Sequence, residues 1–297
     1  TPVSLSPRAI GIGAALAGAF AYGINIVYAR AATQQGVSAA DLVFLRVFLM
    51  LGAVTATIGL AGGSLQVERR HRPVLALVGV SSAGIGLAYF FAVSFVPIGV
   101  AAVIFYTFPL LILIASPFVD GERLTLARLA VFALAFAGLA VALGPTLGAI
   151  DLRGVALAAA ASLFAACQFF AAAHAGRHVA PSALLFWSHV VIMPIAGLAA
   201  LWHGLGQLNA LTGAWFAAAM TMLGYLAGFA FQMLSARSAP PALVGLVFCL
   251  EPVVAIATAN LVLGETLTTP QMVGSLLVLA ALVASSLAEL RRRPQPA

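Results

Sequence analysis

One carboxyl group stands in the middle of a long apolar run, directly before a proline: Glu251, followed by Pro252. If this run spans a membrane, an ionised carboxyl group at its centre costs about 2.5–3.5 kcal/mol to insert and therefore needs a reason. Proline lacks an N–H and disturbs the preceding helical turn, which leaves a free carbonyl beside the acid. Two interpretations stay open: a site for a substrate amine or a proton, and a protonated carboxyl group that joins two helices by a hydrogen bond.

Polar amides and aromatic rings also occur inside apolar runs. Asn25 and Gln168 stand at matching places in two runs, 143 residues apart, and Tyr89 and Gln232 are related by the same offset. An aromatic lining with a few amides suits a small zwitterion with an apolar side chain. These residues predict a binding site for a small molecule.

Other reactive residues are expected to have structural roles. Arg46 and His189 are matched by the same offset; we expect Arg46 to reach the interface or to pair with another helix, and His189 to be a hydrogen-bonded interior histidine. His174 and His178 have the i, i+4 spacing of a metal pair, but no third ligand lies near them in the sequence. We therefore expect no metal and no cofactor.

No catalytic set is recognisable in the sequence. Ser188 and His189 are sequence neighbours, which we expect to point to different helix faces and so not to form a nucleophile–base pair. The sequence predicts that the protein is not an enzyme. A membrane-embedded enzyme remains the alternative from another class, whereas a receptor or scaffold is disfavoured by the short loops.

The elements that hold these residues must lie in lipid. Of 297 residues, 63% are hydrophobic and 7% are charged, with a mean hydropathy of +1.11. A soluble domain carries about 25% charged residues, so this chain could not cover its surface in water. At about 20 residues per span, the sequence predicts ten membrane helices, at residues 9–29, 40–60, 73–95, 97–119, 124–143, 154–173, 182–202, 212–235, 240–263 and 269–287.

The chain is an internal repeat with an offset of 143 residues. Gly11 matches Gly154, and Pro109 matches Pro252. We expect one membrane domain made of two repeats, residues 1–147 and 148–297. Each repeat holds five spans, an odd number, so the second enters the membrane upside down. Inverted repeats are typical of transporters that open alternately to either side.

The arginines predict the orientation of the spans. All 14 basic residues are Arg, and with the N-terminus inside, eleven of them lie in inner segments and two, Arg30 and Arg153, in outer ones. Both termini are therefore expected to be cytoplasmic. The scattered arginines form no basic face, which argues against a nucleic-acid partner. The Ala-rich, Arg-only composition favours a bacterial inner (plasma) membrane.

A short motif closes the fourth span of each repeat: Gly121-Glu122-Arg123-Leu124-Thr125 and Gly264-Glu265-Thr266-Leu267-Thr268. A structural interpretation is sufficient for it, because Gly ends a helix in left-handed geometry while Glu and Thr favour the next helix start. With ten spans in a five-plus-five arrangement, the chain nevertheless resembles the drug/metabolite transporter superfamily in its ten-helix EamA-type branch. One departure is Phe108 in the first repeat, where the second has Glu251.

The resemblance implies a function and a site. Within this superfamily the chain is most like the exporters of aromatic and hydrophobic amino acids. This resemblance implies alternating access through a central cavity between helices 1, 3, 4, 6, 8 and 9. Another drug or metabolite carrier of the same superfamily is the alternative. The expected partners are an amino acid or similar metabolite, the lipid bilayer and, as a candidate co-substrate, protons. The expected substrate-binding residues are Tyr22, Asn25, Tyr89, Phe105, Tyr106, Phe164, Gln168, Gln232, Phe248 and Glu251.

Overall fold

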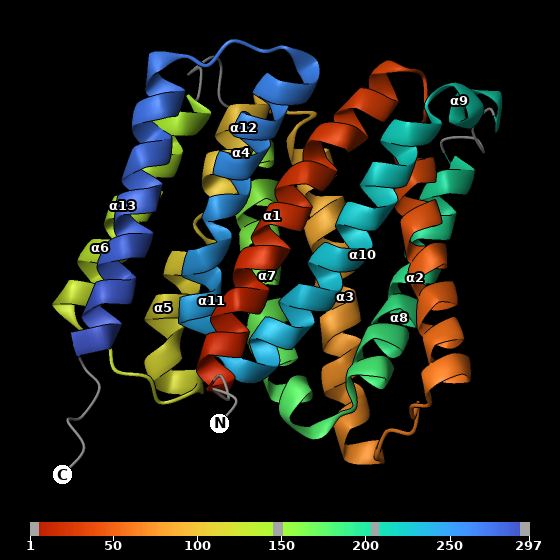
Figure 1. The fold of residues 1–297 in the computed structure, drawn as a ribbon, viewed down its shortest axis with the longest axis horizontal. Helices are drawn as coiled ribbons and strands as arrows, with labels where there is room; N and C mark the ends of the chain where they lie inside the picture. Colours follow the sequence, from red (N-terminus) through yellow and green to blue (C-terminus); the bar gives the residue numbers. More distant parts are fainter. Residues whose placement is uncertain (1–5, 145–150, 203–207, 292–297) are drawn as a thin grey trace, which may run out of the picture.

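The computed structural model describes residues 6–144, 151–202 and 208–291, and every regular element in these ranges is a helix (Figure 1). The first half contains α1 (Pro7–Gln34), α2 (Ala39–Ala61), the short 3-10 helix η1 (Arg69–His71), α3 (Arg72–Ala92), α4 (Ile98–Phe105), α5 (Phe108–Val119) and α6 (Leu126–Leu143). The second half contains α7 (Leu152–His178), α8 (Pro181–Trp202), α9 (Leu208–Gly213), α10 (Trp215–Ser238), α11 (Pro241–Phe248), α12 (Leu250–Leu263) and α13 (Thr269–Arg291).

Ten segments of the described chain are long and apolar enough to cross a membrane. Eight are single helices, with η1 continuing into α3, and the other two are the helix pairs α4–α5 and α11–α12. This confirms the predicted all-α membrane fold with ten spans. Several helices extend beyond the predicted ranges; α1, expected at 9–29, runs from Pro7 to Gln34.

The fourth span of each half is broken in the middle. α4 ends at Phe105, and α5 begins at Phe108 with Pro109 in its first turn. In the second half α11 ends at Phe248, and α12 begins at Leu250. Proline is tolerated in a first helical turn, where the N–H that it lacks has no intrahelical partner. Glu251, predicted midway along a continuous span, therefore lies in the first turn of a new helix.

The two halves pack against each other symmetrically: each main contact between two spans has a counterpart in which the halves have changed roles. The first span of each half packs on the third span of the other, as α1 with α10 and α7 with α3. The second spans α2 and α8 contact each other, and so do the fifth spans α6 and α13, which lie side by side in Figure 1. This is the arrangement expected of two inverted repeats. The predicted boundary at residues 147 and 148 lies outside the described residues.

Small residues allow the closest of these contacts. The sequence singles out Gly84, Gly86, Gly224 and Gly228 as positions of close helix approach. A Cβ atom on Gly224 would lie 2.9 Å from the carbonyl oxygen of Ala21, and one on Gly228 would lie 2.7 Å from the Tyr22 ring. The expectation is wrong for Gly86, where a Cβ would meet nothing within 4 Å.

The Gly-Glu motifs close the fourth spans as their structural interpretation predicts. Gly121 and Gly264 have φ angles of 74° and 68°, the left-handed conformation that favours glycine. Glu265 makes a salt bridge of 2.7 Å with Arg30 at the end of α1. Thr125 caps α6, with its hydroxyl accepting a hydrogen bond from the Arg128 amide at 3.3 Å. The motif therefore stabilises helix ends.

The start of the first span and the end of the last span lie on the same side of the bundle. α1 starts, and α13 ends, at the lower end in Figure 1, where η1 and the end of α7 also lie. The arginine distribution predicts that this end faces the cytoplasm. Arg292 and Arg293, which contribute to that prediction, lie outside the described residues.

Candidate functional site

A chain of hydrogen-bonded side chains crosses the middle of the bundle. The Tyr22 hydroxyl donates to Gln232 Oε1 at 3.0 Å, and Gln232 Nε2 donates to Gln168 Oε1 at 2.9 Å. Gln168 Nε2 then donates to the Ser82 hydroxyl at 2.7 Å. We call these four residues the polar chain. It links α1, α10, α7 and α3, and it connects the two halves of the molecule at two of its three contacts, Tyr22 with Gln232 and Gln168 with Ser82.

The buried side chains of the polar chain have hydrogen-bond partners within the protein. Gln168 and Gln232 are each 5% exposed, so their amides need protein partners. The Ser82 hydroxyl, which accepts from Gln168, donates to the Val78 carbonyl at 2.6 Å. In this conformation the two amides bind one another.

A second group of predicted residues surrounds the break between α11 and α12. The Tyr106 hydroxyl hydrogen-bonds with the Glu251 carboxyl group, and Tyr89 lies within the electrostatic reach of Glu251. The Phe105 ring packs against Tyr89 at 5.5 Å and against Tyr106 at 5.2 Å between centroids. We call Glu251, Tyr106, Tyr89 and Phe105 the Glu251 cluster.

Two opposing effects act on the ionisation of Glu251: its apolar surroundings favour the neutral acid, whereas its place at the start of α12 favours the carboxylate. A carboxylate in the first turn of a helix faces the positive end of the helix dipole and amides without intrahelical partners. Glu251 makes no salt bridge with any described residue, so its charge has no permanent counterion there. A cationic group of a ligand is the natural complement to such a carboxylate.

Tyr22 and Phe248 connect the two groups. Their ring centroids are 6.1 Å apart, and Tyr22 lies within the electrostatic reach of Glu251. Phe248 also packs edge-on against Phe169 at 5.5 Å. Eight of the ten predicted site residues thus form one continuous region between the halves.

The other two predicted residues have separate partners. Asn25, the repeat counterpart of Gln168, donates from Nδ2 to the Thr221 carbonyl at 2.6 Å and so ties α1 to α10. Phe164 packs over Gly84, where a Cβ would lie 2.8 Å from its ring. The structure does not join either of them to the polar chain.

Arg46 and His189 share a partner on α10. The Arg46 guanidinium lies 4.3 Å from the centroid of the Tyr225 ring, and the Tyr225 hydroxyl donates to His189 Nε2 at 3.0 Å. His189 Nδ1 bonds the Leu185 carbonyl at 2.8 Å; since a carbonyl only accepts, Nδ1 carries the proton. Both expectations are confirmed: Arg46 pairs with another helix, and His189 is a satisfied interior histidine.

Ser188 and His189 lie closer together than expected, but they form no nucleophile–base pair. The Ser188 hydroxyl does approach His189, at 3.4 Å from Nδ1, because a seryl hydroxyl can turn back toward its own helix. Nδ1 carries a proton, so it cannot accept one from Ser188. The expectation that no third potential ligand lies near His174 and His178 is wrong in space: one ring nitrogen of His71 and of each of these two residues lie within 4.8 Å of one another.

Sequence reasoning missed Ser82 as a member of the polar chain and Tyr225 as the partner of Arg46. A signal for both was present, because Ser82 and Tyr225 are themselves 143 residues apart. A search for polar residues at matched positions of both repeats would have found the pair.

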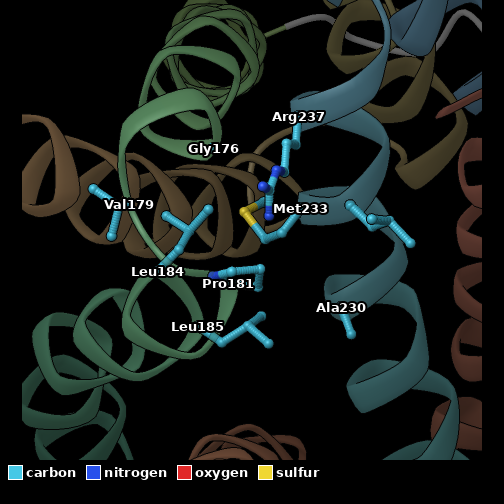
Figure 2. Close-up of a pocket in the computed structure, with 9 residues that line it drawn as sticks. Gly176, Val179, Pro181, Leu184, Leu185, Ala230, Met233 and Arg237 are labelled. Carbon is cyan, nitrogen blue, oxygen red and sulfur yellow. The ribbon is translucent and has the colours of Figure 1, made fainter. Parts of the chain in front are cut away.

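Two small pockets lie away from these residues. One of about 40 Å³ lies between α7, α8 and α10; Figure 2 shows Leu184, Met233 and Arg237 around it. The other, of about 70 Å³, lies between α6, α11 and α13. Sites for small molecules usually measure about 300–1,000 Å³, so these two have room for water molecules but not for an amino acid.

Comparison with known proteins supports both the internal repeat and the overall fold. The model of the EamA-like transporter family matches the chain twice, at residues 9–144 and 152–287, which are separated by the same 143-residue offset. A solved crystal structure has the same fold, with a TM-score of 0.73 and 23% identity over 94% of this chain and 99% of the other.

Named relatives are exporters. The chain is 27% identical over 284 residues to the threonine/homoserine exporter RhtA of Escherichia coli K12, which covers 89% of both chains. It is 26% identical over 243 residues to RhtA of Salmonella typhimurium LT2, covering 78% of this chain and 76% of the relative. Because both halves match the family model over nearly their whole length, the chain belongs to the EamA-like transporter family.

Proposed function

We propose that this transporter exports neutral amino acids, above all those with aromatic or other hydrophobic side chains, by alternating access. The observation that carries the proposal is the position of Glu251: a carboxyl group without a counterion among the described residues, at the break of a membrane helix and beside aromatic rings. In transporters with inverted repeats, substrate sites lie near the middle of the membrane where helices are discontinuous.

The chemistry of the region fits a zwitterion. The Glu251 carboxylate would bind the ammonium group, and the Tyr89, Phe105 and Phe248 rings would contact an apolar side chain. The amide nitrogens of Gln168 and Gln232 are suitable donors to a carboxylate. In the present conformation one N–H of each nitrogen bonds within the polar chain, so a substrate carboxylate would use the second N–H or displace the present acceptor.

The same contacts support alternating access. The polar chain is shared between the halves, with Tyr22 and Ser82 in the first and Gln168 and Gln232 in the second. A substrate that takes over these hydrogen bonds exchanges a contact between halves for a contact with itself. Binding and rearrangement of the halves are then coupled through one set of amides.

A transport assay of the purified protein in liposomes tests the substrate class. We expect uptake of phenylalanine, tryptophan and leucine above that of protein-free liposomes, measured with and without a pH gradient. Threonine and homoserine belong in the same panel, because the named relatives are exporters of these amino acids. Transport of these two with none of the apolar ones would contradict the apolar preference; transport of none of the five would contradict the proposal as a whole.

The role of the Glu251 carboxyl group is tested by Glu251→Gln, which keeps the shape and most hydrogen bonding but cannot ionise. We expect transport, or its pH dependence, to be lost. Glu265→Gln is the matched control, because Glu265 lies at the other end of α12, where its side chain is 42% exposed and paired with Arg30. Wild-type rates and pH profile in Glu251→Gln would leave this carboxyl group as a connection between helices.

A further inference from the structure

Three histidines meet where the first half of the molecule contacts the second. His71 ends η1 at the start of α3, while His174 and His178 lie on the last turns of α7. The His71 and His178 rings are stacked, with centroids 5.0 Å apart, and His174 lies 4.8 Å from His178. One ring nitrogen of each residue lies within 4.8 Å of those of the other two.

Hydrogen bonding prepares one of these imidazoles as a ligand. His178 Nδ1 bonds the His174 carbonyl at 2.8 Å, and because a carbonyl only accepts, the proton is on Nδ1. The lone pair of His178 is therefore on Nε2. Metal-binding histidines usually donate their other ring N–H to a carbonyl or carboxylate in this way, which fixes both the tautomer and the orientation of the ring.

The surroundings define an accessible site. His71 is buried, at 8% exposure, whereas His174 and His178 are exposed. One ligand is thus anchored between the helices, and the other two face the surroundings, with room for water as a fourth ligand. Three nitrogen ligands with an open position is a coordination pattern of zinc, and neutral imidazoles do not suit Mg²⁺ or Ca²⁺, which prefer oxygen ligands.

We propose that His71, His174 and His178 form a binding site for a divalent transition-metal ion such as Zn²⁺, which fastens the start of α3 to the end of α7. The flanking Arg72 and Arg177 carry positive charge, which repels a metal cation and weakens its binding. Zn–N bonds measure about 2.0–2.1 Å, so the three nitrogens, now within 4.8 Å of one another, must move closer together to bind one ion.

The site has a consequence for transport that rests on the proposed function. α3 belongs to the first half and α7 to the second, and the histidines lie at one end of their contact. An ion bound there holds this end of the two helices together. If the halves must separate at this end during the cycle, the ion slows transport.

Calorimetric titration of the purified full-length protein with ZnCl₂, after removal of any polyhistidine tag, tests the site without requiring transport. We expect one ion per chain, and an affinity more than about tenfold weaker in each of His71→Ala, His174→Ala and His178→Ala, since even the loss of an outer-shell partner costs about 10–100-fold. Arg177→Gln is the matched control from the same turn of α7. It should bind at least as tightly as the parent, because a repelling charge is removed. MgCl₂ should give no binding.

Equal Zn²⁺ affinity in the parent and all three alanine variants would overturn the site. Titrations of variants that keep the parent's melting temperature exclude misfolding as the cause of a loss. In liposomes, Zn²⁺ should slow transport by the parent and not by His178→Ala; equal slowing of both would overturn the fastening of α3 to α7. Failure of the proposed substrate class would leave the calorimetric result intact, so the two proposals fail separately.

Discussion

At the scale of single residues, Tyr225 carries two roles that one aromatic ring can combine. Its face receives the Arg46 guanidinium, and its hydroxyl donates to His189. The buried Nε of Arg46 has no hydrogen-bond partner among the described residues, so the attraction between the cation and the ring has to offset part of the cost of placing a charge there. Tyr225 therefore makes specific polar contacts from α10 to both α2 and α8, in addition to its packing.

The hydroxyl of Tyr225 can be removed while its ring is kept. Tyr225→Phe leaves buried His189 Nε2 without a donor, and an unsatisfied buried acceptor costs about 1–3 kcal/mol. We expect a lower melting temperature in a thermal-shift assay of the detergent-solubilised protein. Tyr28→Phe is the control, because the Tyr28 hydroxyl has no hydrogen-bond partner among the described residues while its ring packs on Phe216. An equal effect of both changes would contradict the role of the hydroxyl.

At the scale of helices, the contact of α1 with α10 depends on backbone proximity. A Cβ added at Gly224 would lie 2.9 Å from the Ala21 carbonyl oxygen, which is part of the α1 backbone and cannot turn aside as a side chain can. The same turn of α1 carries Tyr22 and leads to Asn25, so the close approach also sets the distance over which the polar chain must reach.

Gly224→Ala should therefore force α1 and α10 apart. We expect a lower melting temperature and, under the proposed function, slower transport, because the Tyr22–Gln232 hydrogen bond of 3.0 Å is lengthened. Gly86→Ala is the same change at a helical glycine with nothing within 4 Å of the added Cβ. There we expect unchanged or higher stability, since alanine is favoured over glycine in a helix by about 1 kcal/mol. A Gly224→Ala protein as stable as Gly86→Ala would contradict the packing argument.

The helices were easier to predict than the contacts between them. A span through lipid needs about 20 consecutive apolar residues. This requirement is visible in the local composition, so all ten spans could be located from the sequence. A disturbed turn before Pro252 was expected, but the division of both fourth spans into two helices was not, because proline allows a break without determining how the backbone forms it.

The candidate site was predicted as far as the repeat could reveal it. Gln168 and Gln232 could be identified because the first repeat has the polar residues Asn25 and Tyr89 at the matching positions. His71 did not, because it is far from His174 and His178 in the sequence, and only the packing of α3 on α7 brings the three together. Contacts between distant segments carry no local signature.

At the scale of the whole molecule, the arginine distribution predicts which end faces the cytoplasm. Arg70→Cys and Arg153→Cys, in a background without Cys167 and Cys249, place one thiol at each end of the bundle, and both parent arginines are exposed. A membrane-impermeant maleimide added to intact cells should label position 153 and not position 70. The reverse pattern would invert the topology and place both termini outside.

The breaks in the internal symmetry have a thermodynamic consequence. If the two halves were identical, exchanging their roles would convert the inward-open state into the outward-open one, and the two states would have equal free energy in a symmetric membrane. Any preference between them must therefore come from pairs that do not match, such as Phe108 with Glu251 and Arg46 with His189. Under alternating access, unmatched positions such as these set the resting bias of the conformational equilibrium, whereas identical pairs such as Pro109 with Pro252 contribute equally to both states.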